Sequence, residues 1–369
     1  MGRVSQRFPD FPWDTIAGAK ARASAHPGGI VDLSVGTPVD PAPALARQAL
    51  AGAADAHGYP TVAGPEAVRQ SIVDWLGRAT GATGLTADHV LMTVGSKELI
   101  GNLPLQLGLG AGDLVVFPEL AYPTYEVGAR YAGCEVLATD STVAVGPRRP
   151  SLFYLNSPAN PSGKILGVEH ARKVVEWARE RGTLLVSDEC YLDFAWDEPA
   201  VSVLHPDVCG GDTTGLLAVF SASKRSNLAG YRGSFVAGDP AVVAELLAVR
   251  KHLGFMVPTP VQQALAATLA DDAHVAEQRE RYDRRRTVLR EALERAGFRI
   301  DHSQGSLYLW ARRQTERGDE PCRDTVDWLS ERGILVAPGD FYGPAGSHHV
   351  RVAFTATDER IAAAADRLA

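Results

Sequence analysis

The chain has 369 residues, of which 45% are hydrophobic and 22% charged, and its 37 basic and 44 acidic side chains give a formal net charge of −7. At about 150 residues per domain, this length predicts two domains with full-sized cores, and the composition excludes wholesale disorder. The mild acidity and the lack of a long Lys/Arg run argue against binding to nucleic acid or to an anionic membrane. An enzyme or binder of small molecules is the class that remains.

Cysteine spacing and the N-terminal sequence bear on metal binding, disulfide formation and the cellular compartment. The four cysteines (Cys134, Cys190, Cys209 and Cys322) are scattered and form no C-x-x-C pair, so neither a zinc site nor a disulfide framework is expected. The start MGRVSQRFPDFPWD lacks the apolar segment of a secretory signal, and no run approaches the roughly 18 apolar residues of a membrane span. We expect a cytoplasmic protein without a bound metal.

The elements predicted before residue 240 alternate in type. The first 35 residues are predicted to form an arm, because the prolines of FPDFPW prevent a regular helix and IVDLSVGTP indicates a short strand that ends at Gly36 and Pro38. Helical periodicity then alternates with short apolar runs. Helices are predicted at 44–56, 64–80 and 168–182, and strands at 89–94, 113–118, 134–139, 151–156, 183–189 and 215–221. This alternation predicts a mostly parallel sheet with helices on both faces.

The pattern changes after about residue 240. Residues 240–254 and 260–296 are strongly helical. Shorter apolar runs follow at 298–303, 306–311, 334–339 and 349–354, with helices predicted at 325–333 and 357–369. We therefore predict a large α/β domain over 36–250 and a small α+β domain built from 251–369 together with the arm 1–35.

The stretch FSASKRSNLAGYRG, residues 220–233, carries the strongest chemical signal. An apolar run delivers Ser221, Ser223 and Lys224 into a loop, and Arg232 follows. A lysine just after a buried strand can be desolvated, which lowers its pKa and frees its amine to react with a carbonyl group. The neighbouring hydroxyls and guanidinium suit an anionic phosphate. Taken alone, a Ser-Lys pair is more often a solvated loop lysine.

Two further motifs follow apolar strands. NSPANPSG (156–163) places Asn160 near the carboxyl end of a parallel strand, where ligands of open α/β sheets bind. LLVSDECY (184–191) places Asp188 at the end of another strand, with Tyr191 three residues later. A carboxylate there could hold the N–H of a protonated pyridine ring and stabilise it as an electron sink. The alternatives are an ordinary Asn-Pro turn and an aspartate that caps a helix.

Two weaker motifs complete the set. In GSKELI, Ser96 and Lys97 open a helix, so their backbone N–H groups and the helix dipole could bind a phosphate. In AYPTY, Tyr122 could stack on a flat ring, although packing in a turn is the commoner use of a Tyr-Pro pair.

Taken together, these residues resemble the class I and II aminotransferases, the pyridoxal 5′-phosphate (PLP) enzymes of fold type I. The resemblance covers nearly the whole chain. It is carried by V-G-x-P at 35–38, G-Y-P at 58–60, G-S-K-E at 95–98, Y-P-x-Y at 122–125, N-P-S-G at 160–163, D-E-C-Y at 188–191, S-x-S-K at 221–224 and R-x-A at 351–353. It implies a fold type I PLP-transferase: a large α/β domain with a mostly parallel sheet flanked by helices, plus a small α+β domain.

The resemblance also implies which residues hold the cofactor ring. Lys224 would bind the cofactor covalently and later move the proton between the substrate Cα and the cofactor C4′. Asp188 would pair with the pyridine nitrogen, and Tyr122 would stack on the ring face. Tyr191 and Asn160 would contact the phenolic oxygen.

For the cofactor phosphate, the resemblance implies the backbone N–H groups of Ser96 and Lys97, the hydroxyls of Ser221 and Ser223, and Arg232. Tyr59 would reach the phosphate bound by the neighbouring subunit, because the active sites of this family lie at a dimer interface. We therefore expect a homodimer with shared active sites.

Arg351 is implied to grip the substrate α-carboxylate, helped by the backbone of Gly36 and the amide of Asn160. A bidentate guanidinium would hold the Cα–H bond perpendicular to the cofactor ring. The alternative for Arg351 is a strand-face arginine paired with a surface acid.

Within the family, the chain is most similar to actinobacterial proteins assigned as N-succinyldiaminopimelate aminotransferases, through phrases such as FPWDTIA, DLSVGTPVDP and ILVAPGDFYG. This implies ping-pong transfer of an amino group, with glutamate as donor, in lysine and diaminopimelate biosynthesis. The long dianionic side chain of that substrate needs a second cation besides Arg351. The candidates are Arg250, Lys251, His252, Lys20 and Arg22, which are otherwise solvated helix residues.

Three other functions stay open. The chain could be an aspartate- or aromatic-type aminotransferase, a PLP-dependent C–S β-lyase, or a PLP-binding ligand sensor fused to a DNA-binding helix-turn-helix. The sensor is disfavoured because we find no basic N-terminal module in the chain. For the enzyme, the expected partners are amino-acid and 2-oxo-acid substrates, with no nucleic acid and no membrane.

Overall fold

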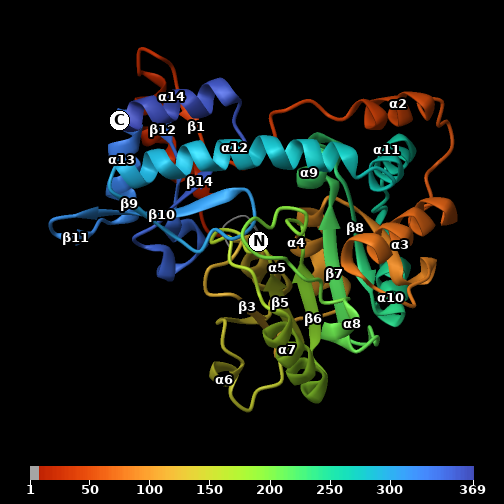
Figure 1. Ribbon diagram of the computed structural model, residues 1–369. Coiled ribbons are helices and arrows are strands. Elements are labelled where there is room, and N and C mark those ends of the chain that lie inside the picture. Colours follow the sequence, from red (N-terminus) through yellow and green to blue (C-terminus); the bar gives the residue numbers. More distant parts are fainter. Residues whose placement is uncertain (1–7) are drawn as a thin grey trace, which may run out of the picture.

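The computed structural model describes residues 8–369, and its main sheet is the seven-stranded layer in the lower half of Figure 1. The first seven residues of the predicted arm lie outside the described residues. In spatial order the strands are β2 (Val90–Val94), β8 (Gly233–Gly238), β7 (Leu216–Ser221), β6 (Leu184–Asp188), β5 (Leu152–Asn156), β3 (Leu114–Phe117) and β4 (Glu135–Ala138). Strand β8 runs antiparallel to both of its neighbours, and the other neighbouring pairs are parallel.

Helices cover both faces of this sheet, so the predicted α/β architecture is confirmed. Successive side chains of a strand point to opposite faces, and in β5 Phe153 packs into one core while Tyr154 packs into the other. The Phe153 core includes α3 (Glu66–Thr80), α7 (Val168–Arg181) and α11 (Thr259–Leu269). The Tyr154 core includes α4 (Ser96–Gln106), α5 (Thr124–Ala132) and α10 (Pro240–Leu253).

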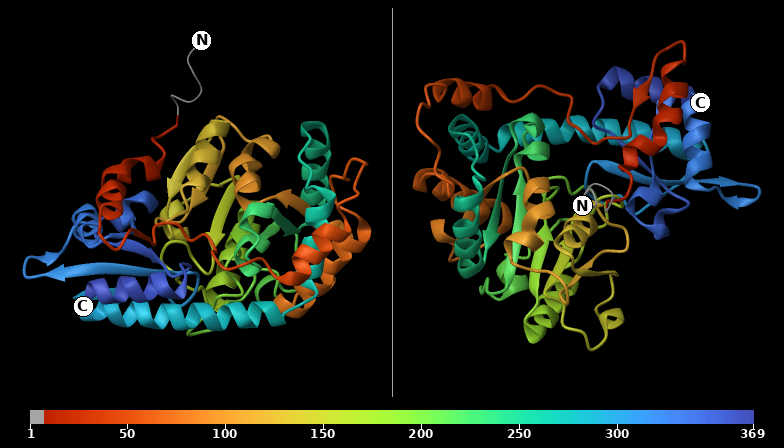
Figure 2. Two further views of the ribbon diagram at one scale, coloured as in Figure 1. Left: turned by 90° about the horizontal axis from the view of Figure 1, so that it is seen from above. Right: turned by 180° about the vertical axis from the view of Figure 1, so that it is seen from behind.

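A second, five-stranded sheet holds the C-terminal third of the chain. It consists of β9 (Phe298–Asp301), β10 (Tyr308–Thr315), β11 (Gly318–Asp319), β13 (Ala337–Pro338) and β14 (Val350–Ala353). Beside it lie α13 (Cys322–Glu331), α14 (Asp358–Leu368) and the N-terminal α1 (Ala17–Ser24), which packs against α13. The short strand β1 (Val31–Asp32) pairs in parallel with β12 (Ile334–Leu335). Figures 1 and 2 show this early segment, in red, among the blue C-terminal elements. The boundaries 36–250 and 251–369 stay a prediction.

One long helix links the two sheets. Helix α12 (Ala273–Arg295) runs from the neighbourhood of α9 (Ala222–Arg225) and α11 to α13 and α14 (Figures 1 and 2). The region 260–296, predicted as continuously helical, is therefore two helices, separated at Ala270–Asp272. The helix predicted at 44–56 is also shorter, because α2 (Ala44–Gly52) ends at Gly52. The remaining short helices are α6 (Thr142–Val145) and α8 (Pro206–Cys209).

Strand β8 was not predicted, because its sequence GSFVAG is poor in side chains that favour strands. The small residues are needed where the strand packs closely. A Cβ atom at Gly238 would collide with the backbone of Leu216 in β7, and the Ser234 hydroxyl lies 2.7 Å from that of Thr93 in β2. Tertiary packing therefore overrides the weak local signal.

The parallel strands end together at one edge of the sheet. In the register, Asn156 is opposite Asp188, and Asp188 is opposite Val219. Three motifs that lie far apart in the sequence are thus brought side by side at the carboxyl ends of β5, β6 and β7, where open α/β sheets bind their ligands.

Candidate active site

A cavity of about 550 Å³ opens at this edge, between the large sheet and the second sheet. Every residue predicted to contact the cofactor or the substrate α-carboxylate lines it, with the exception of Tyr59. These residues are Gly36, Ser96, Lys97, Tyr122, Asn160, Asp188, Tyr191, Ser221, Ser223, Lys224, Arg232 and Arg351.

Lys224 lies in the short helix α9, directly after β7. Its Nζ donates a hydrogen bond to the carbonyl oxygen of Gly36. Burial lowers the pKa of Lys224, and the positive charges of Arg351 and Arg232 lower it further. A larger neutral fraction of this amine is what nucleophilic attack on a carbonyl requires.

Asp188, the last residue of β6, forms the floor of the cavity. It accepts hydrogen bonds from the Tyr125 hydroxyl at 2.8 Å and from the Cys190 backbone N–H at 3.2 Å. Burial raises its pKa. Within residues 8–369, Asp188 has no cationic partner. Because a buried carboxylate without a counter-charge is costly, this arrangement fits a ligand that carries a protonated ring nitrogen.

A cluster of donors lies at another corner of the cavity. Ser96 and Lys97 open α4, whose first backbone N–H groups have no partner within the helix. The preceding Gly95 has φ +80, and a Cβ atom there would collide with the Arg232 guanidinium. Ser221 accepts a hydrogen bond from the Ser223 backbone N–H at 3.1 Å. A helix N-terminus beside a guanidinium and two hydroxyls has the chemistry of a phosphate site.

The opposite end of the cavity holds a fixed guanidinium. Arg351 in β14 is 3% exposed and donates to the Asn160 Oδ1 and the Ser34 carbonyl oxygen, each at 2.8 Å. Within the described chain its Nε has no partner. Asn160 is held in turn by Asn156, whose Oδ1 accepts the Asn160 backbone N–H at 2.7 Å. Because Arg351 lines the cavity, its guanidinium is a candidate to bind a carboxylate there.

Tyr308 is the main residue of the cavity that the sequence analysis missed. Its hydroxyl lies 2.9 Å from that of Tyr191, and the Arg351 guanidinium carbon lies 3.9 Å from its ring centre. Burial alone would raise the pKa of Tyr308, but the Arg351 and Lys224 cations bring it below the usual value. The pKa of Tyr191 is instead raised, by burial and by Tyr308. A side chain at Gly36 would collide with Tyr308, which explains the glycine.

Further lining residues were also not predicted as site residues, among them Phe11, Trp13 and Cys190. Phe11 and Trp13 come from the arm, and the Lys97 ammonium lies 5.8 Å from the Phe11 ring centre and 5.9 Å from that of Tyr122. Cys190 lies beside Asp188, and burial raises its pKa. Only the tertiary structure brings the arm over the cavity.

The proposed second cation contacts do not line this cavity. Arg250 is fully buried and pairs with both carboxylate oxygens of Glu98, at 2.9 and 2.8 Å, so it supports the start of α4. Arg22 pairs with Asp327 on α13. Lys20, Lys251 and His252 are exposed residues elsewhere on the surface. Tyr59 is 96% exposed and also lies outside the cavity.

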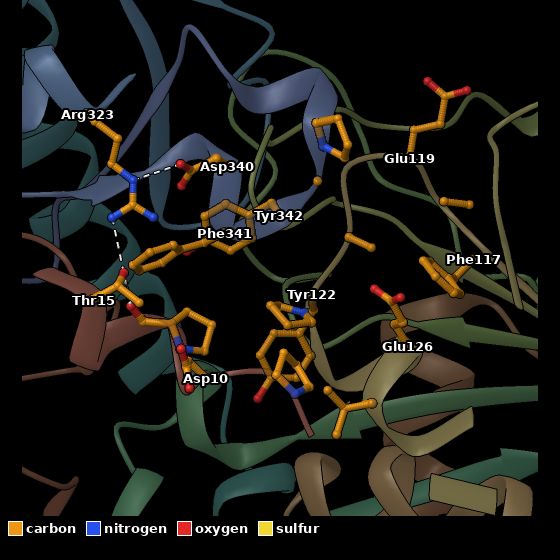
Figure 3. A pocket seen from close by; sticks show the side chains of 18 residues that line it. Asp10, Thr15, Phe117, Glu119, Tyr122, Glu126, Arg323, Asp340, Phe341 and Tyr342 are labelled. Carbon is orange, nitrogen blue, oxygen red and sulfur yellow. Dashed lines mark hydrogen bonds and ion pairs between the residues drawn. The ribbon is translucent and has the colours of Figure 1, made fainter. Parts of the chain in front are cut away.

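A second cavity, of about 400 Å³, adjoins the first and shares Tyr122 with it (Figure 3). Its charged lining residues are Asp10, Glu119, Glu126, Asp340 and Arg323. The single guanidinium is engaged, because Arg323 donates to Asp340 at 2.7 Å and to the Thr15 hydroxyl at 3.1 Å. This second cavity is therefore acidic, whereas the first one is rich in cations.

No group of three or more His, Cys, Asp or Glu residues in 8–369 is placed to hold a metal ion. None of the helices between residues 8 and 369 is long and apolar enough to span a membrane.

Comparison with known proteins agrees with this geometry. Residues 29–368 match the family model "Aminotransferase class I and II". The chain belongs to this family, whose members depend on PLP, and the protein is a PLP-dependent aminotransferase. The unpaired Asp188, the donor cluster at α4 and the buried Lys224 fit the ring nitrogen, the phosphate and the aldehyde of that cofactor.

Named relatives differ in substrate. The chain is 63% identical to a "probable aminotransferase" of Mycobacterium tuberculosis, covering 100% of this chain and 87% of the relative. It is 54% identical to the 4-dedimethylamino-4-oxo-anhydrotetracycline transaminase of Streptomyces rimosus (98% and 99% covered). It is 30% identical to the LL-diaminopimelate aminotransferase of Gloeobacter violaceus (98% and 96% covered).

Solved structures share the fold. A substrate-bound BacF structure from Bacillus subtilis superposes with a TM-score of 0.90 at 24% identity, covering 100% of this chain and 96% of that one. A "probable N-succinyldiaminopimelate aminotransferase" from Thermus thermophilus gives a TM-score of 0.86 at 26% identity, with 97% and 99% covered. The predicted fold type I architecture is thus confirmed.

Proposed function

We propose that the protein transfers an amino group between L-glutamate and a 2-oxo acid in a ping-pong cycle, with Lys224 as its catalytic residue. The observation that carries this proposal is the arrangement of charge around one cavity. The amine of Lys224 shares the cavity with three groups. They are the unpaired buried carboxylate of Asp188, the donor cluster that includes the start of α4 and Arg232, and the fixed guanidinium of Arg351. The ring nitrogen and the phosphate of PLP and the α-carboxylate of an amino acid then each meet a group of opposite charge.

When bound, PLP supplies the carbonyl that takes up the amino group and the ring that accepts electrons from the substrate Cα. Asp188 keeps the ring nitrogen protonated, and Tyr122 stacks on the ring. The hydroxyls of Ser221 and Ser223, the first N–H groups of α4, and Arg232 bind the phosphate. Tyr191 and the Asn160 amide contact the phenolic oxygen.

Lys224 holds and moves the proton of the substrate Cα. Its lowered pKa leaves a share of the amine neutral at physiological pH, so that it can accept this proton. In the absence of a ligand, the Gly36 carbonyl oxygen orients the amine of Lys224. Arg351 binds the α-carboxylate, and this fixes the Cα–H bond toward Lys224.

Lys97 is the best-placed side chain for a second, distal carboxylate. It is the cavity's cation besides Lys224, Arg232 and Arg351 within the described residues. Its ammonium lies 5.8 Å from the ring centre of Phe11 and 5.9 Å from that of Tyr122. Glutamate and 2-oxoglutarate each carry such a carboxylate, which supports glutamate as the donor.

For the second substrate we keep the pair formed by N-succinyl-LL-2,6-diaminopimelate, of lysine and diaminopimelate biosynthesis, and its succinylated amino-keto acid. The keto acid would accept the amino group of glutamate, and N-succinyl-LL-2,6-diaminopimelate would be the product. Support comes from the printed name of the Thermus structure and from the LL-diaminopimelate relatives. A succinyl carboxylate would bind at Lys97, since the acidic second cavity past Tyr122 repels an anionic chain. The Streptomyces transaminase shows that a relative of higher identity bears the name of a different acceptor, so a polycyclic ketone is the second candidate.

We further propose that the protein is a homodimer in which Tyr59 reaches the phosphate bound by the partner subunit. The 96% exposure of this tyrosine on its own chain supports a role outside that chain.

The first experiment is the absorbance spectrum of the PLP-loaded protein before and after addition of L-glutamate. We expect the visible band to bleach and to return when a 2-oxo acid is added. A screen of acceptors, beginning with succinylated amino-keto acids, then ranks the 2-oxo acids by their kcat/KM. A protein that stays yellow with glutamate contradicts the donor assignment, and release of ammonia with pyruvate from cystathionine would establish the lyase instead.

A further inference from the structure

A third and very small cavity adjoins the active-site cavity. It shares Cys190 and Ser221 with the active-site cavity, and its other lining residues include Glu189, Asp193 and Arg225. Its volume of about 10 Å³ is the room that a single water molecule needs. Glu189 and Arg225 are the immediate chain neighbours of the site residues Asp188 and Lys224.

Two polar atoms of opposite character are left without partners at this place. Glu189 is 2% exposed, and its Oε1 accepts the Val203 backbone N–H at 2.8 Å. Its Oε2 has no hydrogen bond of good geometry within residues 8–369, although the Ser187 and Ser202 hydroxyls lie near this carboxyl group. Arg225 is 3% exposed, and its Nε likewise has none. Buried polar atoms are nearly always satisfied, by protein or by ordered water.

The rest of the Arg225 guanidinium is firmly held. Its Nη1 donates to the Thr268 carbonyl oxygen at 2.8 Å, and its Nη2 donates to Asp272 at 2.6 Å. Asp193 lies 3.5 Å from Nε, too far for a good hydrogen bond. Asp272 immediately precedes α12, so Arg225 joins α9, which carries Lys224, to the helix that links the two sheets.

We propose that the small cavity binds one water molecule that joins the Glu189 carboxyl group to the Arg225 guanidinium, and that these two residues position α9, the short helix that carries Lys224. The water accepts from Arg225 Nε–H and donates to Glu189 Oε2, so both unpartnered atoms are satisfied. The bridge ties the end of β6 to the residue after Lys224, and Arg225 continues the connection to α12. The positioning role rests on the proposed role of Lys224, whereas the water site does not.

The water site is tested by a crystal structure of the PLP-loaded enzyme at a resolution that shows ordered solvent. We expect one water within hydrogen-bond distance of Glu189 Oε2 and Arg225 Nε. An empty cavity, or a direct contact between these two side chains, would overturn the proposal. This readout does not depend on which residue performs the chemistry.

The positioning role is tested with the Glu189→Leu and Arg225→Met variants, loaded with PLP. Misplacing a reacting group by a fraction of an ångström slows chemistry more than binding, so we expect kcat to fall about tenfold with KM for glutamate changed less than about threefold. The pH midpoint of the cofactor's visible band, which reports the surroundings of Lys224, should shift in both variants. Unchanged kcat and unchanged midpoint in both would overturn the role.

Two further variants control for general effects. Glu189→Gln keeps a polar group for the water and should restore kcat to near wild type, even where Glu189→Leu fails to fold. Arg279→Met removes another guanidinium that bonds to the Asp193 segment, through the Asp193 carbonyl oxygen at 2.8 Å, but that does not line the cavity. It should leave kcat and the midpoint unchanged. A loss in Glu189→Gln as large as in Glu189→Leu would contradict a water-mediated role.

Discussion

Arg351 on β14 donates a 2.8 Å hydrogen bond to the side-chain oxygen of Asn160, which follows β5 in the other sheet. Residues 191 positions apart thus meet in one contact that crosses from the second sheet to the first. The bond turns the Asn160 amide so that its NH₂ group is free to donate into the cavity. The two proposed α-carboxylate contacts are therefore positioned together.

Arg351→Ala should weaken the binding of every amino-acid substrate, because it removes a buried charge that pairs with the α-carboxylate. The loss of transition-state stabilisation, calculated from the ratio of the two kcat/KM values, should be about 2–5 kcal/mol. Arg351→Lys should recover only part of it, since an ammonium cannot form the bidentate contact. The measurement is the rate of bleaching as a function of glutamate concentration. Equal apparent affinity in wild type and Arg351→Ala would place the carboxylate elsewhere.

Lys224→Ala should abolish turnover and leave the fold intact. The side chain supplies the reacting amine, whereas its one hydrogen bond goes to the Gly36 carbonyl oxygen. Transamination assays and far-UV circular dichroism, measured on the same sample, check both parts. Lys173→Ala, which changes an exposed lysine on α7, is the control. Near-normal transamination by Lys224→Ala would refute the assignment of the catalytic lysine.

Lys97→Met should lower kcat/KM only for substrates that carry a distal carboxylate. We expect about a tenfold loss of kcat/KM for glutamate, the scale of a charge-assisted hydrogen bond, and little change for alanine, which has no distal carboxylate. Lys251→Met, on the exposed part of α10, should affect neither substrate. A parallel loss for both amino acids would assign Lys97 to cofactor binding alone.

Tyr59→Phe should weaken PLP binding only if the subunits pair as proposed. On its own chain the hydroxyl is almost fully exposed, so its removal from a monomer would change nothing. We expect a dimer by sedimentation and a several-fold faster loss of PLP from Tyr59→Phe on dialysis. Tyr131→Phe alters another exposed tyrosine and serves as the control. A monomer, or identical PLP retention, would contradict the shared site.

Glu189 should give the stability of the protein a distinct pH dependence. Burial raises the pKa of Glu189 to about 7, above its value in the unfolded chain, so the folded state binds this proton more tightly. The protonated carboxyl group therefore contributes to the free energy of unfolding. This contribution is fully present below the pKa that Glu189 has in the unfolded chain, and it is lost as the pH rises through 7. Glu189→Gln should therefore flatten the fall in unfolding free energy between about pH 4.5 and 7, by up to about 3 kcal/mol. Urea unfolding at several pH values measures it, and parallel curves for the two proteins would rule the effect out.

Much of the architecture could be read from local patterns. Apolar runs such as 215–221 predicted β7, because a fully buried parallel strand needs apolar residues on both faces. Strand β8 was not predicted because its small residues are required by close packing against β2 and β7. Those two strands are distant in the sequence, so a local pattern does not reveal the requirement. The break between α11 and α12 was missed for a similar reason, since Ala270–Asp272 still fits a helical period.

For the site, the sequence by itself determined the residues that follow the strands of the large sheet, namely Asn160, Asp188 and Lys224, because parallel strands end at one edge. Only the tertiary structure decided that Tyr308 and the arm residues Phe11 and Trp13 complete the cavity. It also decided that Arg250 is a buried partner of Glu98 and no substrate contact. The physical reason is the same in each case. Short-range patterns encode which face of an element is buried, whereas contacts between distant elements arise only when the two sheets and the linking helix pack together.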